Sequence, residues 1–228
     1  QFVSFKYKSQ MLEIFQKTVS ENITFEGIGL HSGKISTVKI LPANEDTGII
    51  FKRVDLKNNN IIKANFLNVT STKLCTTLEN THGVKVSTVE HLLAAIYISG
   101  IDNAIIEISG EELPIMDGSA KEFLDNIKKI GLKKQNKKRK YLKVKEKIEL
   151  KDGKREIYIQ PNDTSLEVSF QLDYKNKVIG KQKNTVDFQK DNLRDVINSR
   201  TFCLYSEIEK IKKIGLAKGG SLDNAVVV

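Results

Sequence analysis

The chain lacks several features that would assign it to whole classes of protein. No uninterrupted apolar run approaches the roughly 20 residues that a membrane-crossing helix needs. Nothing near the N-terminus has the order of charged, apolar and small residues of a secretory signal. Cysteine is scarce: Cys75 and Cys203 have no CxxC spacing and are too few for a disulfide framework. Reduced thiols in a cytoplasmic protein are therefore expected.

Histidine is scarce as well, since His31, His82 and His91 are the only three. Any site that uses imidazole chemistry must draw on these residues. The 228 residues, with 39% hydrophobic and 29% charged side chains, are typical of a soluble globular protein with one sizeable core or two small ones.

The net charge of +9 is unevenly spread. Eight basic residues and no acidic one lie between Lys128 and Lys140. Such a run can follow phosphates or an anionic membrane surface. No aromatic residue interleaves it to stack on bases, so we interpret it as a solvated linker that marks a domain boundary.

The first half of the chain predicts short strands and two helices. Strands are expected at 35–41, 48–51, 61–62 and 104–108. A helix that stops at Gly100 has one apolar face, made by Val89, Leu92, Leu93, Ile96 and Tyr97. A second helix is expected after Ser119, which forms a capping-box pattern with Glu122.

The second half repeats the theme. Alternating apolar residues predict strands from Leu142 to Leu150, at Ile157 and Ile159, and from Leu166 to Leu172, with a turn at Asp152-Gly153. A helical stripe over 204–211 and a strand over 225–228 follow. Asp-Asn-Ala precedes a strand in both halves, at 102–104 and 223–225, which indicates two related halves. We therefore predict an α+β fold of two similar domains, 11–134 and 135–228, each a mixed, mostly antiparallel sheet layered with helices.

Glu90-His91, at the start of the first helix, allows two interpretations. Ser87 and Glu90 fit a capping box, which would give Glu90 a structural role and leave His91 solvated. Alternatively, the imidazole could hold a metal ion while the carboxylate takes a proton from its water. Ala94 and Ala95 are small enough to let a ligand approach.

Two glycine-rich loops are further candidates. Three glycines over 27–33 predict a tight turn with close backbone approach, and His31 lies on it as a surface or a site residue. Lys218 and the Gly-Gly-Ser that follows could receive an anion through backbone N–H groups, or form a helix C-cap and turn. Asp117 lies in a turn, and Cys203 has no histidine nearby in sequence.

Six blocks, taken in order, resemble the UDP-3-O-acyl-N-acetylglucosamine deacetylase (LpxC) family: GIGLHSG (27–33), TVEHLLAA (88–95), GIDNAIIEI (100–108), LPIMDGSA (113–120), RTFC (200–203) and GLAKGGSLDNAVV (215–227). These enzymes are zinc amidases of lipid A biosynthesis in Gram-negative bacteria. The resemblance runs from about Phe15 to Val228 and implies two similar domains with the active site between them.

The resemblance also implies roles for individual residues. His91 matches the first zinc ligand, Glu90 the general base and Thr201 the threonine that stabilises the oxyanion. The residues matched to substrate binding are His31, Asp173, Tyr174, Phe202, Lys218, Gly219 and Ser221. The implied partners are a UDP-linked acylated glucosamine and, peripherally, the inner membrane face, with no nucleic acid.

The chain departs from the family pattern in its metal ligands. The family's two other zinc ligands and a later histidine have no match up to Val228. We therefore expect the chain to be incomplete at its C-terminal end, with the remaining ligands beyond Val228, and inactive alone. Two alternatives to an enzyme remain open: a non-catalytic relative that binds UDP-sugars, and a basic nucleic-acid-binding α+β module.

Overall fold

The computed structural model describes residues 14–163 and 166–228, which form four α-helices and mostly antiparallel sheets. The predicted α+β class is confirmed. These residues form two compact units, which we call the platform unit (15–138 and 194–228) and the hairpin unit (14 and 139–193). The predicted domain division at 134/135 stays a prediction. Position 11, at which the first predicted domain begins, lies outside the described residues.

The platform unit is built on a five-stranded sheet. Its strand order is β2-β3-β9-β4-β5. The strands are β2 (Ile23–Ile28), β3 (Ile35–Pro42), β9 (Ala104–Ile108), β4 (Ile49–Arg53) and β5 (Ile61–Lys63). All pairs are antiparallel except β4 with β9. The predicted strands in this region are confirmed.

The register of this sheet aligns one apolar residue from each strand. Neighbouring partners across the five strands are Ile23, Ile40, Ile106, Phe51 and Ile62. All five are buried. Since alternate residues of a strand point to the same face, this row defines the core side of the sheet.

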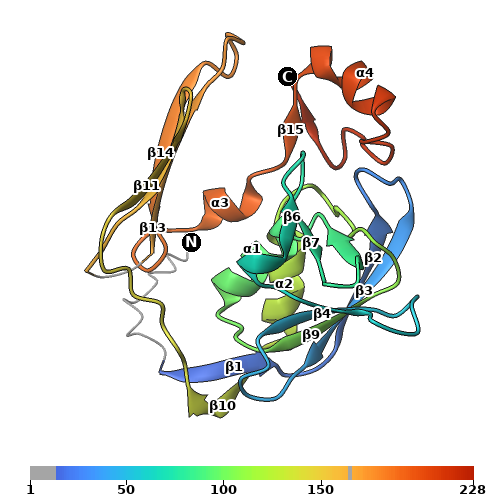
Figure 1. The fold of residues 1–228 in the computed structure, drawn as a ribbon, viewed down its shortest axis with the longest axis vertical. Coiled ribbons are helices and arrows are strands. Elements are labelled where there is room, and N and C mark those ends of the chain that lie inside the picture. The colour runs from blue at the N-terminus through green and yellow to red at the C-terminus, as the bar shows by residue number, and fades with distance from the viewer. Residues whose placement is uncertain (1–13, 164–165) are drawn as a thin grey trace, which may run out of the picture. The chain divides into compact units, whose positions relative to one another are not determined.

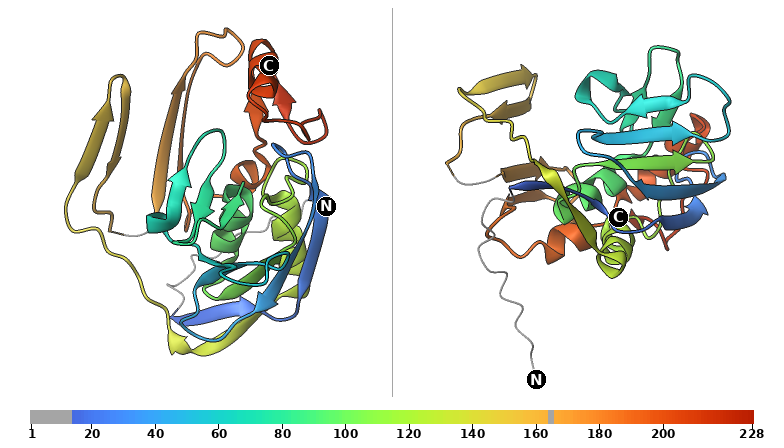
Figure 2. Two further views of the ribbon diagram at one scale, coloured as in Figure 1. Left: turned by 45° about the vertical axis from the view of Figure 1, so that its right-hand side comes forward. Right: turned by 90° about the horizontal axis from the view of Figure 1, so that it is seen from below.

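Two helices cover that core side, α1 (Glu90–Ser99) and α2 (Lys121–Ile130). They lie side by side against the sheet (Figures 1 and 2). Phe123 of α2 packs edge-on against Phe25 of β2, with 4.9 Å between ring centroids. Leu92 of α1 is fully buried in the same core.

Smaller elements surround this core. A three-stranded sheet comprises β6 (Val69–Ser71), β7 (Thr77–Glu79) and β8 (Lys85–Ser87), preceded by the 3₁₀ turn η1 (Phe66–Asn68). The C-terminal part of the unit holds α3 (Arg194–Asn198), β15 (Phe202–Cys203), α4 (Tyr205–Lys213) and β16 (Val226–Val227). β15 and β16 pair in parallel.

Most of the basic run is regular structure, so interpreting it as a solvated linker was wrong: Lys128 and Lys129 lie in the last turn of α2, and a strand follows. A boundary between the two units does fall inside the run, at 138/139. β10 (Leu132–Lys138) pairs antiparallel with β1 (Phe15–Val19). Side chains tie the pair to the rest of the unit, because Gln135 donates to the Ala43 carbonyl at 2.9 Å. The strand with which β10 pairs lies more than a hundred residues earlier in the chain. The pattern of lysines in β10 therefore gives no indication of this pairing.

The hairpin unit contains two antiparallel hairpins. One joins β11 (Ile148–Asp152) to β12 (Arg155–Ile159), and the other joins β13 (Glu167–Asp173) to β14 (Lys181–Asp187). The predicted turn at Asp152-Gly153 is confirmed, but the strand does not extend back to Leu142, which is 95% exposed. No helix within the described part of the chain combines the length and hydropathy that crossing a bilayer requires.

The capping box predicted for Ser87 and Glu90 was wrong, and the one predicted for Ser119 and Glu122 was right only in part. α1 begins after Val89 and α2 after Ala120, neither of which makes a side-chain cap bond. The Ser119 hydroxyl accepts from the Lys121 N–H at 3.0 Å at the start of α2, but the Ser119 N–H donates to Asp117 and not to Glu122. Ser87 is the last residue of β8 and bonds to the Glu111–Leu113 segment through its backbone. Since Ser87 is held in a strand, its hydroxyl cannot cap α1. Glu90 is therefore free of the structural role that a capping box would give it.

Candidate active site

The first turn of α1 carries the Glu90-His91 pair in a half-buried position. The Glu90 carboxylate accepts a hydrogen bond from the Thr76 backbone N–H at 3.0 Å, which fixes its orientation from another segment. Burial lowers the pKa of His91, while the carboxylates of Glu90 and Asp117 act in the opposite direction. A neutral imidazole is the form that can accept a metal ion or a proton.

The turn at Asp117-Gly118 connects this pair to Thr201. The Asp117 carboxylate acts electrostatically on His91, and its backbone carbonyl accepts from the Arg200 guanidinium at 2.6 Å. One residue further on, the Thr201 N–H donates to the Gly118 carbonyl at 2.8 Å. The structure therefore brings Thr201 to the turn whose carboxylate acts electrostatically on His91, although 110 residues separate Thr201 from His91 in sequence.

Gly118 makes this connection sterically feasible. It has a φ of +85°, and a Cβ atom there would collide with the backbone carbonyl of Asn224 and approach the Thr201 side chain. A side chain at this φ would be strained, and only glycine leaves room here for the turn that carries Asn224.

The His31 loop packs against the loop that follows α4. The His31 carbonyl accepts from the Lys218 N–H at 3.2 Å, and the Leu30 carbonyl accepts from the Gly219 N–H at 3.0 Å. A Cβ atom on Gly219 would collide with the Gly29 carbonyl. The predicted close backbone approach at these glycines is confirmed, and its partner is the second glycine-rich loop.

A buried carboxylate, Glu112, joins the His31 loop to the start of α1. It accepts from the backbone N–H groups of His31 and Ser32, both at 2.7 Å, and from the Thr88 hydroxyl at 3.0 Å. Only 5% of Glu112 is exposed. Three donors satisfy this buried charge, so it clamps together two segments that carry candidate site residues.

His31 and Cys75 form an electrostatic pair beside this clamp. A hydrogen bond with Cys75 raises the pKa of His31 against the opposing effect of burial, and the Glu112 charge adds to the rise. Burial acts to raise the pKa of the Cys75 thiol, but hydrogen bonds with His31, Thr88 and Thr77 outweigh it and the pKa is lowered. The imidazole Nε2 also lies 3.3 Å from the Leu74 carbonyl oxygen.

Backbone strain is concentrated around these segments. Among the residues that the structure describes, six non-glycine residues have a positive φ, and four of them adjoin the residues described above: Leu74, Thr88, Met116 and Ala217. They directly precede Cys75, Val89-Glu90, Asp117 and Lys218. Left-handed backbone in large or β-branched residues is costly, and it persists where the surroundings enforce it, most often at functional sites.

Several predicted residues lie elsewhere. Asp173 ends β13 in the hairpin unit, where it pairs with Lys181 at 3.6 Å, and Tyr174 follows it. Phe202 pairs with Val226 between β15 and β16 and is 39% exposed. Their predicted roles, with those of Lys218, Gly219 and Ser221, stay predictions.

The described residues do not form a complete zinc site. Residues 14–163 and 166–228 contain no cluster of three His, Cys, Asp or Glu side chains able to share a metal ion. His82 lies in an exposed turn after β7, so a three-histidine site receives no support. His91 is a nitrogen donor and its lowered pKa favours the neutral form, so it suits the predicted role of one zinc ligand. One imidazole does not hold zinc by itself.

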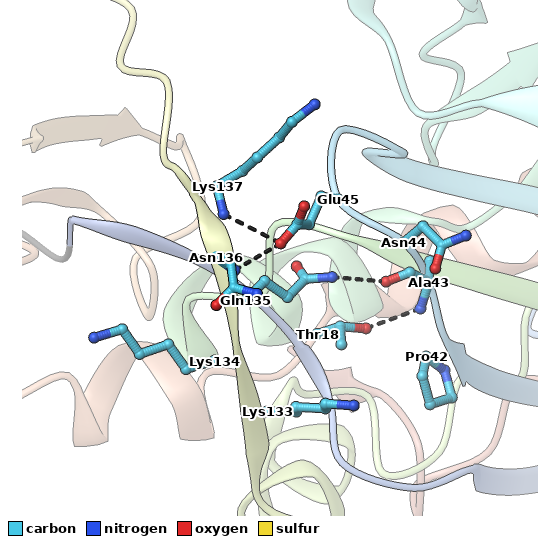
Figure 3. Close-up of a pocket in the computed structure, with 10 residues that line it drawn as sticks. All are labelled: Thr18, Pro42, Ala43, Asn44, Glu45, Lys133, Lys134, Gln135, Asn136 and Lys137. Carbon is cyan, nitrogen blue, oxygen red and sulfur yellow. Dashed lines mark hydrogen bonds between the residues drawn. The ribbon is translucent and has the colours of Figure 1, made fainter.

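A hollow of about 460 Å³ lies away from these residues, between β10 and the 42–45 loop (Figure 3). Glu45 accepts from the backbone N–H groups of Asn136 and Lys137 across it, at 2.6 and 3.1 Å. None of the predicted site residues lines this hollow. Glu45, Gln135 and Thr18 bond to the backbone of neighbouring lining residues, and Lys134 lies over the Phe15 ring.

Sequence reasoning missed Glu112 and Cys75 and set Asp117 aside as a turn residue. Glu112 contacts residues that lie 24 and about 80 positions away in the chain. The only sequence signal for it was its place directly before the LPIMDGSA block. No local pattern distinguishes it from the exposed Glu111 beside it.

The chain is similar over most of its length to one family of known proteins. The model of the UDP-3-O-acyl N-acetylglycosamine deacetylase family matches residues 16–228. The UDP-3-O-acyl-N-acetylglucosamine deacetylase of Geobacter sp. (strain M21) is 44% identical over 216 residues, covering 94% of this chain and 70% of the relative. The enzymes of that name from Teredinibacter turnerae and Shewanella violacea are 44% and 38% identical over 218 residues, covering 94% of this chain and 71% of each relative.

Proposed function

This chain belongs to the UDP-3-O-acyl N-acetylglycosamine deacetylase family, and we propose that it is the enzyme that hydrolyses the N-acetyl amide of UDP-3-O-acyl-N-acetylglucosamine in lipid A biosynthesis. The observation that carries the proposal is the junction of three segments: the Glu90-His91 turn of α1, the Asp117-Gly118 turn, and Thr201 bonded to that turn.

The chain's own residues account for the proton transfer in amide hydrolysis. Glu90, oriented by the Thr76 N–H, removes a proton from the attacking water as the new C–O bond forms. The Thr201 hydroxyl donates to the oxyanion that develops on the acetyl carbon. The C–N bond then breaks, acetate leaves, and the sugar nitrogen takes up a proton to become the free amine.

We propose zinc as the cofactor and His91 as one of its ligands. When bound, zinc would supply a Lewis acid for the carbonyl and the water. The described residues hold only this single fitting ligand, so no step is assigned to the metal. The same observation supports the second candidate function, a relative that binds UDP-sugars without turning them over.

The remaining predicted residues are proposed to bind substrate. Lys218 is exposed at the loop that packs on His31, where an ammonium group suits a diphosphate. Phe202 offers an exposed aromatic face to the acyl chain, while Asp173 and Tyr174 are proposed to hold the uridine and sugar. The protein is proposed to act in the cytoplasm, with peripheral contact to the inner membrane face.

The test is Glu90→Ala in the full natural protein. Turnover is expected to fall by about 10²–10⁴-fold while bound zinc is unchanged, because Glu90 moves a proton and does not hold the metal. Glu122→Ala is the matched control, since Glu122 also lies in the first turn of a helix. Acetate release and metal content are measured on each variant.

Each outcome has a distinct meaning. Unchanged turnover in Glu90→Ala removes Glu90 from the mechanism. A zinc-loaded wild-type protein that binds a UDP-sugar but releases no acetate favours the non-catalytic relative. Salt-sensitive RNA binding without turnover favours a nucleic-acid-binding module.

A further inference from the structure

The turn η1 presents two large apolar side chains to solvent. Phe66 is 81% exposed and Leu67 is 75% exposed. Large apolar residues in adjacent, almost fully exposed positions are unusual and mark interaction sites when they belong to a larger patch.

The turn that carries them is held firmly by hydrogen bonds. The Asn65 side chain accepts from the Leu67 N–H at 3.0 Å, and the Asn68 side chain donates to the Lys63 carbonyl at 2.9 Å. The Asn68 N–H donates to the Asn65 carbonyl at 2.9 Å. The exposure of Phe66 and Leu67 therefore follows from a turn whose backbone is fixed by hydrogen bonds.

The surrounding segment, 56–78, is basic and has no acidic residue. We call it the docking segment. Its three lysines, Lys57, Lys63 and Lys73, are exposed and form no ion pair with any residue the structure describes. The nearest acids on either side are already engaged, since Asp55 bonds to Arg53 and Glu79 lies 3.6 Å from Lys85.

Further apolar side chains of the docking segment are exposed beside these lysines. Ile61 (44%) shares the outward face of β5 with Lys63, because the residue between them, Ile62, is buried. Val69 (38%) follows the turn, and Leu74 (54%) follows Lys73. Apolar and cationic groups therefore alternate along one exposed stretch.

The docking segment continues directly into the candidate active site. The Leu74 carbonyl lies 3.3 Å from the His31 imidazole, and the Thr76 N–H holds the Glu90 carboxylate. Phe66 and Leu67 thus lie on the same stretch of chain as the residues that contact His31 and orient Glu90.

We propose that the docking segment binds a lipid bilayer containing anionic lipid. Phe66 and Leu67 enter the boundary between headgroups and acyl chains, and Lys63 and Lys73 contact lipid phosphates. A bilayer fits better than a protein partner, because exposed apolar side chains on a segment whose lysines pair with no described acid match an anionic interface. The inference rests on the proposed function in one respect: an acylated substrate gives the enzyme a reason to work at a lipid surface.

The experiment measures cosedimentation of the full natural protein with vesicles. Binding is expected with phosphatidylglycerol-containing vesicles and not with pure phosphatidylcholine. The double variant Phe66→Ser, Leu67→Ser is expected to lower the partition coefficient at least about tenfold, since both side chains lose apolar area buried on binding. Lys63→Gln and Lys73→Gln are each expected to lower it about fivefold.

Matched controls separate this surface from general stickiness. Leu150→Ser with Phe170→Ser removes two apolar side chains of similar exposure, 68% and 61%, from the hairpin unit. Lys212→Gln with Lys213→Gln removes two exposed charges from α4. Both controls are expected to bind like the wild type.

Three results would overturn the inference: no vesicle binding by the wild type, equal binding by the Phe66→Ser, Leu67→Ser variant, or equal losses in the controls. Hydrolysis of a water-soluble substrate is expected to be unchanged in that variant, and its loss would reassign the turn to the catalytic fold. Vesicle binding without any deacetylation by the wild type would refute the proposed function and leave the inference standing.

Discussion

The five-stranded sheet of the platform unit and the hairpins of the hairpin unit share one sequence pattern and differ completely in burial. In the sheet, the cross-strand partners Phe51 and Ile106 are fully buried. In the first hairpin, the equivalent apolar partners Leu150 and Ile157 are 68% and 70% exposed. The alternation of apolar residues indicates which face of a strand can be buried. Whether that face is buried depends on a second layer of structure that packs against it. α1 and α2 supply that layer for the sheet, and the candidate active site lies on the segments this layer fixes.

The largest expected difference in stability is between replacing a buried phenylalanine, Phe123, and an exposed one, Phe170. Phe123→Ala should cost about 3–5 kcal/mol, because it leaves a cavity between α2 and the sheet and removes the contact with Phe25. Phe170→Ala in β13 should change stability by less than about 0.5 kcal/mol, because its ring is 61% exposed. Urea denaturation of each variant measures both values. Equal losses would mean that the hairpin face is covered in solution.

The next comparison uses two glycines with positive φ. Gly118→Ala should cost about 2–5 kcal/mol, since it combines the left-handed penalty with a collision against Asn224. Gly153→Ala, in the β11–β12 turn, meets nothing within 4 Å and should cost only about 1 kcal/mol. Thermal denaturation separates the two. If Gly118→Ala folds normally and keeps full turnover, the proposed link between Thr201 and the Asp117 turn is wrong.

A smaller difference is expected for two carboxylates. Glu112→Gln puts an amide NH₂ in place of one carboxylate oxygen, where it opposes at least one backbone N–H donor, and should cost about 1–3 kcal/mol. It should also lower kcat more than it raises KM, because the clamp between the His31 loop and the start of α1 is weakened. Glu149→Gln in the first hairpin removes an exposed ion-pair partner and should leave the denaturation midpoint unchanged. A Glu112→Gln variant with wild-type kcat would reduce Glu112 to a structural role.

The smallest expected effect is a difference in the rate of alkylation between the two cysteines of the platform unit. Burial and the Glu207 charge raise the pKa of Cys203, whereas the pKa of Cys75 is lowered through His31 and its neighbours. Iodoacetamide should therefore alkylate Cys75 faster at neutral pH, because the thiolate is the reacting form. Peptide mass spectrometry follows both rates. His31→Gln should slow Cys75 and leave Cys203 unaffected; faster reaction at Cys203 would contradict the assignment.

The sequence predicted the parts of the fold that depend on local periodicity. β3, β9 and the first helix follow from alternation and from the i, i+3, i+4 stripe, and the Asp152-Gly153 turn follows from turn chemistry. β10 was missed because its strand character comes from pairing with β1, more than a hundred residues away. The Ser87–Glu90 capping box failed because Ser87 is the last residue of β8, whereas the Ser119 hydroxyl does accept a hydrogen bond at the start of α2.

The candidate site divides in the same way. Glu90, His91 and Thr201 were named through the family blocks, and the structure joins their segments through Asp117 and Gly118. The Glu112 clamp and the His31–Cys75 pair were not predictable, because each depends on contacts between loops far apart in sequence. Periodicity carries no information about such contacts.

The four left-handed residues around the site, Leu74, Thr88, Met116 and Ala217, have a consequence for engineering. Replacing Ala217 by glycine would relax its backbone without removing a hydrogen-bonding side chain. Replacing Thr88 would relax its backbone too, but it would remove the buried hydroxyl that donates to Glu112, so strain relief and loss of the clamp oppose each other. Screens for heat resistance should therefore select substitutions at Ala217 before Thr88, and a Thr88 variant should lose turnover because the first turn of α1 is less firmly held.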